Sequence, residues 1–184
     1  MHLRVMAGLL LISVILIAAM PSESSLGESY KLVYIHVPVT AVMIVSLILF
    51  PILHFRMALS DIRSFSTATS VYSIIHLIVS LIFMYVSWGG IVFSEVRFAF
   101  SVTLFLFAIT HTFLCFLDSG LARAYSFFIY PIILYFYAVL SRTEFQLHPT
   151  AVKMPLLLYI PYIFSVPLVL LLYFQLKNFV RSKC

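Results

Sequence analysis

The chain has 184 residues, of which 64% are hydrophobic and only 9% are charged, and its mean hydropathy is +1.15. A soluble domain of this length buries only about two thirds of its unfolded surface, so it cannot hide so many apolar side chains from water. The composition therefore excludes a water-soluble monomer. At about 20 residues per membrane crossing, the length leaves room for about six or seven spans and for no separate soluble domain.

Net charge and cysteine content narrow the possible functions less than the apolar composition does. The formal charge of +5 would suggest a nucleic-acid partner in a soluble protein. In a membrane protein it usually reflects basic residues on the cytoplasmic side, so we expect membrane lipid and no nucleic acid around this chain. Cys115 and Cys184 form no CxxC pair, which indicates neither a disulfide framework nor covalent haem attachment.

Apolar runs between charged residues predict six transmembrane helices. They should be helices because backbone polar groups in hydrocarbon must be bonded within their own segment. The predicted fold class is therefore all-α, a polytopic membrane protein with one domain over residues 1–184. The expected spans are about 4–20, 33–53, 68–87, 98–117, 124–140 and 155–176. The first could also be a secretory signal peptide, although its uninterrupted length after Arg4 favours a retained helix.

The distribution of basic residues predicts the orientation. With both termini in the cytoplasm, seven basic residues lie inside and four lie outside, in accord with the positive-inside rule. The inner set is Arg4, Arg56, Arg63, Arg123, Lys177, Arg181 and Lys183, and the outer set is Lys31, Arg97, Arg142 and Lys153. The expected location is the cell (plasma) membrane, with the functional site on its outer face.

Three unusual features share the outer face in this orientation. His36 stands at the outer end of the second helix, Trp88 opens the connector 88–97, and His148 lies in the last outer loop. An imidazole near a helix N-terminus tends to stay neutral and can bind metal, and Pro38 suits the first turn of such a helix. A lone histidine or tryptophan at this depth is also a common interfacial anchor, so both interpretations stand.

Two neutral imidazoles could ligate a haem iron from opposite sides. His36 and His148 are the candidate axial ligands of a non-covalent haem b. Basic side chains could pair with its propionates, and Arg would do so through two hydrogen bonds. The candidates for this pairing are Arg97, Arg142, Lys31 and Lys153.

Three motifs resemble the CcmC family, the haem-handling proteins of cytochrome c maturation that are also called haem exporter protein C. GESYKLVYIHVP, residues 27–38, resembles the family's GExYRIMYIHVP. The connector 88–97 aligns without a gap with the signature WGTWWVWDxR, where Trp88 and Gly89 match the opening WG and Arg97 matches the Arg. The segment from residues 137–142 through residues 147–149, which include His148, resembles the family's stretch ending in TLH. Six helices with both termini inside are also the family's architecture.

The resemblance implies a function and a set of partners. His36 and His148 match the family's axial haem ligands, and the connector matches its tryptophan-rich haem platform. A family member holds haem at the outer membrane face and hands it to the haem chaperone CcmE. It works with an ABC transporter made of CcmA and CcmB and with the small protein CcmD, in the assembly of cytochromes c.

The connector departs from the family pattern. Ile91, Val92 and Ser94 replace three of the four tryptophans, and Glu95 replaces the Asp. The chain is thus identified as a divergent member. Stacking on haem would have to come from Trp88, Phe93, Phe98 or Phe100, or from the apolar side chains themselves.

Other histidines suggest alternatives. His76 and His111 are expected at depths that differ by only roughly 5 Å, so they could hold a common ligand such as a second haem. His54 and His2 are interpreted as ordinary residues of the inner boundary. The competing functions are a b-type haem electron-transfer subunit that uses His76 and His111, and a non-haem scaffold subunit of an exporter.

Catalysis is not expected. No nucleophile and base stand in a spacing that suggests hydrolysis, and no glycine-rich phosphate loop is present. The sequence therefore predicts a binding and transfer protein rather than an enzyme.

Overall fold

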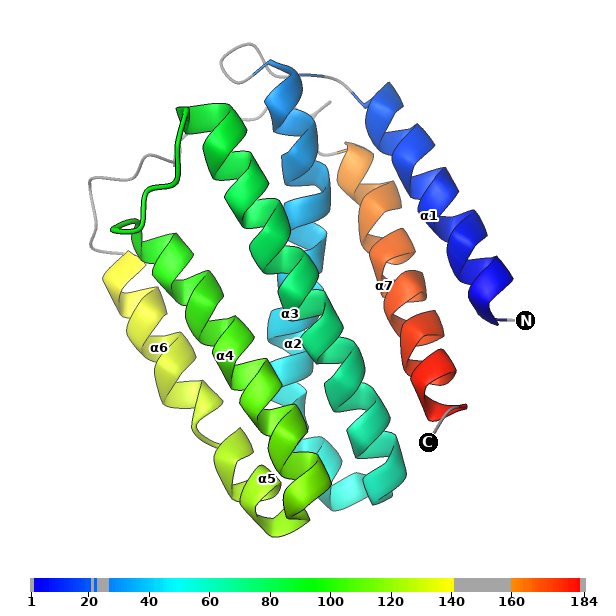
Figure 1. The fold of residues 1–184 in the computed structure, drawn as a ribbon, viewed down its shortest axis with the longest axis vertical. Coiled ribbons are helices and arrows are strands. Elements are labelled where there is room, and N and C mark those ends of the chain that lie inside the picture. Colours follow the sequence, from blue (N-terminus) through cyan, green and yellow to red (C-terminus); the bar gives the residue numbers. More distant parts are fainter. Residues whose placement is uncertain (1, 21, 23–26, 141–159, 183–184) are drawn as a thin grey trace.

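The computed structural model describes residues 2–20, 22, 27–140 and 160–182, and its regular elements over those residues are all helices (Figure 1). The all-α prediction is confirmed for them. The α-helices are α1 (His2–Ala19), α2 (Val33–Arg56), α3 (Leu59–Trp88), α4 (Val96–Leu117), α5 (Ser119–Ser126), α6 (Ile129–Leu140) and α7 (Ile160–Arg181), and a 3-10 turn, η1 (Glu28–Leu32), leads into α2.

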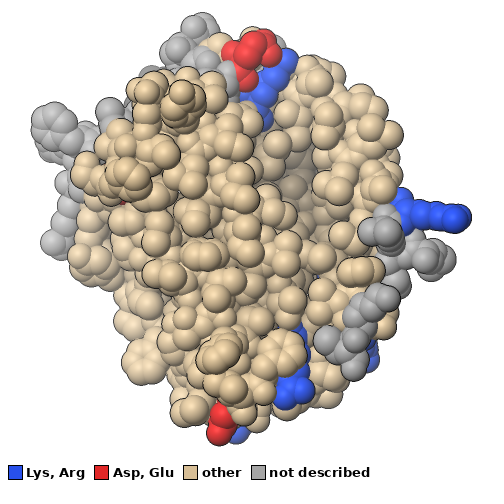
Figure 2. All heavy atoms as spheres, in the orientation of Figure 1, with Lys and Arg blue, Asp and Glu red and all other residues tan. Residues whose placement is uncertain are grey.

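Among the described residues, four helical segments are long and apolar enough to cross a membrane, so the chain is a membrane protein. They are Tyr30–Arg56, Leu59–Trp88, Val96–Leu117 and Ser119–Leu140, and Arg4–Ala19 is a shorter apolar helix. Large apolar side chains point outward, as lipid-facing residues do. Most of the face in Figure 2 is uncharged, and the visible Lys, Arg, Asp and Glu side chains lie near its ends and edge.

Helix α3 is the centre of the bundle, because it packs against α2, α4 and α7. The core lies between these helices and includes Met43, Leu47 and Phe50 of α2. Small residues such as Ala68 and Ala108 are fully buried and let the helices approach closely. Helix α1 lies outside this bundle against α7 (Figure 1).

Two tyrosines tie α7 to α3. The Tyr72 hydroxyl donates to the Val169 carbonyl oxygen at 2.7 Å, and the Tyr173 hydroxyl lies 2.8 Å from Thr69 Oγ1. Tyr72 and Tyr173 also pack edge to face, with ring centroids 5.1 Å apart. Because both hydroxyls are bonded within protein, they can be buried at low cost in free energy.

The bundle has two ends that we name by their contents. The connector end holds η1 and the Gly89–Glu95 connector between α3 and α4. The terminal end holds the link between α2 and α3 and the turn between α4 and α5, and both chain termini point toward it (Figure 1).

The structure corrects one helix boundary that matters for the site. The third helix was expected to start near residue 68, but α3 begins at Leu59. The added segment is polar, yet its hydroxyls bond backwards along the helix, with Ser64 Oγ donating to Ser60 O at 2.9 Å and Thr67 Oγ1 to Arg63 O at 2.8 Å. A polar segment can therefore be helical here.

The predicted span 124–140 is interrupted. It consists of the end of α5 and the whole of α6, separated by a turn at Phe127–Phe128. Pro131 lies in the first turn of α6 and has no N–H to donate to the Phe127 carbonyl, which favours a break at this point. Asp118 caps the start of α5, since its Oδ1 accepts from the backbone N–H of Gly120 at 2.6 Å and of Leu121 at 3.0 Å.

Candidate functional site

A cavity of about 50 Å³ lies at the connector end, where α2, α3 and α4 meet. It joins His36 of α2 with the connector segment, although His36 and Trp88 are far apart in the sequence. Its polar lining is His36, Ser80, Glu95, Arg97 and Ser101, and its apolar lining is Phe83, Met84, Trp88 and Phe98. Four of the predicted site residues, His36, Trp88, Glu95 and Arg97, thus share one cavity.

The ends of α3 and α4 place the connector residues. Trp88 is the last residue of α3, and Gly89 ends the helix in the left-handed conformation at φ 72°, with its N–H donating to Tyr85 O at 3.0 Å. Glu95 is the N-cap of α4, where its Oε1 accepts from the Arg97 N–H at 3.5 Å. Glu95 is only 8% exposed, and its side chain lines the same cavity as that of Arg97.

Hydrogen bonding orients the His36 ring. Its Nδ1 lies 3.4 Å from Ser80 Oγ, and the Ser80 hydroxyl itself donates to the His76 carbonyl oxygen at 2.8 Å. Because the Ser80 hydrogen is used there, Ser80 accepts from His36 Nδ1–H. In a neutral imidazole the lone pair is then on Nε2, which is the arrangement of a histidine prepared to bind a metal.

His76 lies against His36. The two rings stack with centroids 4.7 Å apart and planes inclined by 23°. His76 Nδ1 is 2.9 Å from Thr40 Oγ1, and His76 Nε2 is 2.9 Å from Ser101 Oγ. A hydroxyl oxygen thus lies beside each ring nitrogen, so His76 is placed to position His36 rather than to bind a ligand itself.

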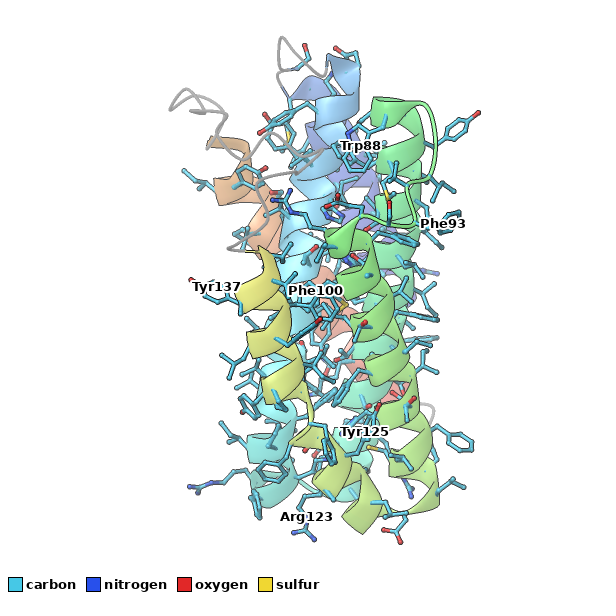
Figure 3. All side chains as sticks on the ribbon, turned by 90° about the vertical axis from the view of Figure 1, so that its left-hand side faces the viewer. Trp88, Phe93, Phe100, Arg123, Tyr125 and Tyr137 are labelled. Atoms are coloured by element: carbon cyan, nitrogen blue, oxygen red, sulfur yellow. The ribbon has the colours of Figure 1, made fainter. Side chains whose placement is uncertain are left out.

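The four candidate aromatic residues differ in their surroundings, and Trp88, Phe93 and Phe100 are labelled in Figure 3. Trp88 and Phe98 line the cavity. Phe93 is 73% exposed and meets Phe98 edge to face at 5.7 Å. Phe100 faces α6, where its ring centroid is 4.8 Å from that of Phe136, so it does not belong to the cavity. Gly89 is exposed beside Trp88.

Lys31 is not placed at the cavity, contrary to its proposed pairing with a propionate. Its Nζ donates to the Ala18 carbonyl oxygen at 2.8 Å and pairs with Glu28 Oε2 at 2.8 Å. It therefore caps the C-terminal end of α1, where a cation is favourable. The Lys31 ammonium holds the pKa of the Glu28 carboxyl below its usual range. His148, Arg142 and Lys153 lie outside the described residues.

Pro38 was expected in the first turn of its helix. It is the sixth residue of α2 and lies inside the helix, because the 3-10 turn η1 and Val33 precede His36. Its ring removes the N–H that would otherwise bond the Tyr34 carbonyl oxygen. His36 therefore stands one turn inside α2 rather than at a bare helix N-terminus.

His76 and His111 do not lie at a common depth. His76 pairs with Ser101 of α4, whereas His111 pairs with Ser66 of α3 at 2.8 Å. These contacts are ten residues apart on each helix, which corresponds to about 15 Å. The expected difference was too small because the start of α3 was placed nine residues too late. A common ligand for this pair does not fit the structure.

Sequence reasoning missed the hydroxyl partners of the site. Ser80 and Ser101 line the cavity, and Thr40 contacts the His76 ring. The spacing of Thr40 and Ser80, each four residues after a histidine, was the available signal, because residues i and i+4 share a helix face. His54 was also underrated, since its Nε2 lies 3.1 Å from His111 Nε2.

Comparisons with known proteins add no assignment. No protein-family model matches the chain, and no curated protein is significantly similar to it. The resemblance to the CcmC family stays a prediction that rests on the three motifs.

The donor chemistry of the cavity fits a haem, but its volume does not enclose one. His36 offers an imidazole Nε2, Arg97 offers a guanidinium for a propionate, and Trp88 and Phe98 offer aromatic surface. A volume of about 50 Å³ holds a few small groups at most and not a macrocycle. A haem could only lie across the mouth of the cavity, with the cavity residues beneath it.

Proposed function

We propose that this chain binds haem b at the connector end and transfers it to a haem chaperone during cytochrome c maturation. The observation that carries the proposal is the cavity that joins His36 with Trp88, Glu95 and Arg97, residues of two separate motifs. The cavity adds to the sequence resemblance because the motifs carry no information about which residues meet in space. The oriented Nε2 of His36 supplies the metal-binding atom.

The predicted site residues have distinct roles in this proposal. His36 is one axial ligand, and His148 is the second. Trp88 packs on the macrocycle, with Phe98 beside it, while Arg97 pairs with one propionate and Arg142 with the other. Glu95 caps α4 and accepts a hydrogen bond from the Arg97 backbone N–H. It therefore positions the backbone from which the Arg97 side chain extends.

The proposal includes topology and partners. Six spans with both termini in the cytoplasm place the connector end at the outer face of the plasma membrane. The chaperone CcmE takes haem there, and CcmA, CcmB and CcmD form the rest of the machinery. Any step driven by ATP belongs to the transporter, so the chain acts in binding and transfer rather than as an enzyme.

The test is the absorption spectrum of the purified full chain, produced with ample haem and kept in detergent or nanodiscs. We expect a six-coordinate bis-histidine spectrum for the wild type. His36→Ala and His148→Ala should each lose most of the bound haem. Added imidazole should partly restore the spectrum of both variants, because it replaces only the missing ligand.

A matched control is His54→Gln, which removes a histidine at the opposite end of the bundle. Its haem content should equal that of the wild type. Full haem in both outer-histidine variants would refute the proposal, and so would a wild-type protein that carries no haem under these conditions. The latter result would favour a scaffold subunit.

A further inference from the structure

A second cluster of ligand-forming side chains lies at the terminal end, away from the haem cavity. It consists of His54 near the end of α2 and His111 and Cys115 near the end of α4. One ligand atom from each lies within 4.8 Å of the others. His111 and Cys115 are fully buried. The haem proposal uses none of these residues.

The hydrogen-bond chain behind His111 determines its tautomer. Ser70 Oγ donates to Ala108 O at 2.9 Å, so Thr112 must donate to Ser70, and Ser66 must donate to Thr112; the Oγ–Oγ1 distances are both 2.7 Å. Ser66 then has only an acceptor left for His111 Nδ1 at 2.8 Å. His111 therefore carries its hydrogen on Nδ1 and its lone pair on Nε2.

That lone pair points at the second histidine. His111 Nε2 and His54 Nε2 are 3.1 Å apart. Two nitrogens bound to one tetrahedral ion at about 2.0–2.1 Å lie roughly 3.3 Å apart, so little movement would bring both onto an ion. Phe50 stacks on the His111 ring at 4.0 Å and 6°, which keeps the ring in this orientation. A metal-binding histidine usually donates its other ring N–H to an oxygen acceptor, as His111 Nδ1–H does to Ser66 Oγ.

Sulfur and charge indicate which ion fits. Cys115 Sγ lies 3.8 Å from His111 Nδ1, and Met57 packs in the same small cluster and lines a cavity of about 130 Å³ beside His54. Among the described residues, the group includes no carboxylate. Arg123 lines the cavity, and Arg63 Nε donates to the Cys115 carbonyl oxygen at 2.9 Å. Sulfur ligands favour a soft metal ion, and the nearby arginine side chains favour a monovalent ion over a divalent one.

We propose that His54, His111 and Cys115 form a copper(I) site at the terminal end of the bundle. The ion enters through the cavity beside His54 and binds both Nε2 atoms, and the Cys115 side chain turns from the Nδ1 side of His111 to bring its sulfur onto the ion. On binding, the thiol proton leaves to solvent, and the hydrogen of His54 moves from Nε2 to Nδ1. One thiolate then balances the single charge of the ion.

The test is titration of the copper-free full chain in nanodiscs with copper(I), without oxygen and against a chromophoric copper(I) chelator. We expect one tightly bound ion per chain, with a sulfur neighbour visible in copper X-ray absorption. Cys115→Ser, which is nearly isosteric, and His54→Gln should each weaken binding at least about tenfold, and Cys115→Ser should remove the sulfur signal. Ser66→Ala should weaken it about 10-fold through the orientation of His111.

Two controls make the outcome specific. Cys184→Ser removes the other cysteine of the chain and should leave copper binding unchanged, as should His36→Ala at the opposite end. Copper binding that is unchanged in both Cys115→Ser and His54→Gln would overturn the proposal. So would a wild type that binds no more copper(I) than a variant carrying both Cys115→Ser and His54→Gln, or that retains zinc(II) in preference to copper(I).

Discussion

The ring of His36 stacks on that of His76 at 4.7 Å, and the backbone carbonyl of His76 is also the acceptor for Ser80, whose hydroxyl faces His36. His76 thus positions His36 through its ring and through its backbone carbonyl. Thr40 strengthens this link, because its Oγ1 donates to the His36 carbonyl oxygen at 2.6 Å and lies 2.9 Å from His76 Nδ1.

Removing the His76 imidazole should loosen the orientation of the His36 imidazole. We expect His76→Ala to lower haem affinity about 10- to 100-fold, which is the usual effect of losing a group that supports a metal ligand. Haem titration of the apoprotein measures this. Added imidazole should rescue His36→Ala but not His76→Ala, because His76→Ala retains its iron ligand. Rescue of His76→Ala by imidazole would show instead that His76 is itself a ligand.

Ser80→Ala removes the acceptor that selects the His36 tautomer. The ring could then rotate or place its hydrogen on Nε2, so haem affinity should fall by about tenfold. Ser80→Thr keeps a hydroxyl that can bond in the same way and is the matched variant. Haem titration of the two variants tests the role, and equal affinities for Ser80→Ala and the wild type would argue against it.

Glu95→Ala removes the N-cap of α4 at the edge of the cavity. The loss of a capping side chain costs about 1 kcal/mol, so the thermal unfolding midpoint in detergent should fall. Glu95→Asp keeps a capping carboxylate and should retain most of the stability. Glu95→Ala removes the cap and the charge together, and haem loss in Glu95→Ala alone would follow from displacement of Arg97.

The tyrosine contacts between α3 and α7 should contribute to stability independently of the site. Tyr72→Phe leaves the ring in place and removes the donor to Val169 O. We expect a loss of about 0.5–1.5 kcal/mol, measured by denaturant unfolding in detergent. Tyr137→Phe on the exposed side of α6 is the control and should have no measurable effect. A similar loss in both variants would contradict the assignment.

The sequence by itself determined the class of the protein. Its apolar excess required a membrane, and a hydrocarbon environment requires helices, so the spans of α2 and α4 were predicted nearly as the structure has them. The positions of His36 and of the Trp88 connector at one end followed from alternating the direction of successive helices.

Only the tertiary structure decided which side chains meet. The predicted spans are apolar on nearly all sides. The 3.6-residue period of an amphipathic helix therefore gives little indication of which helix face turns inward. The polar start of α3 is read as a loop until its hydroxyls are seen to bond along the helix and across to α4. In the folded bundle His76 of α3 meets His36 of α2, and His111 of α4 meets His54 of α2, and these two pairings define the two candidate sites.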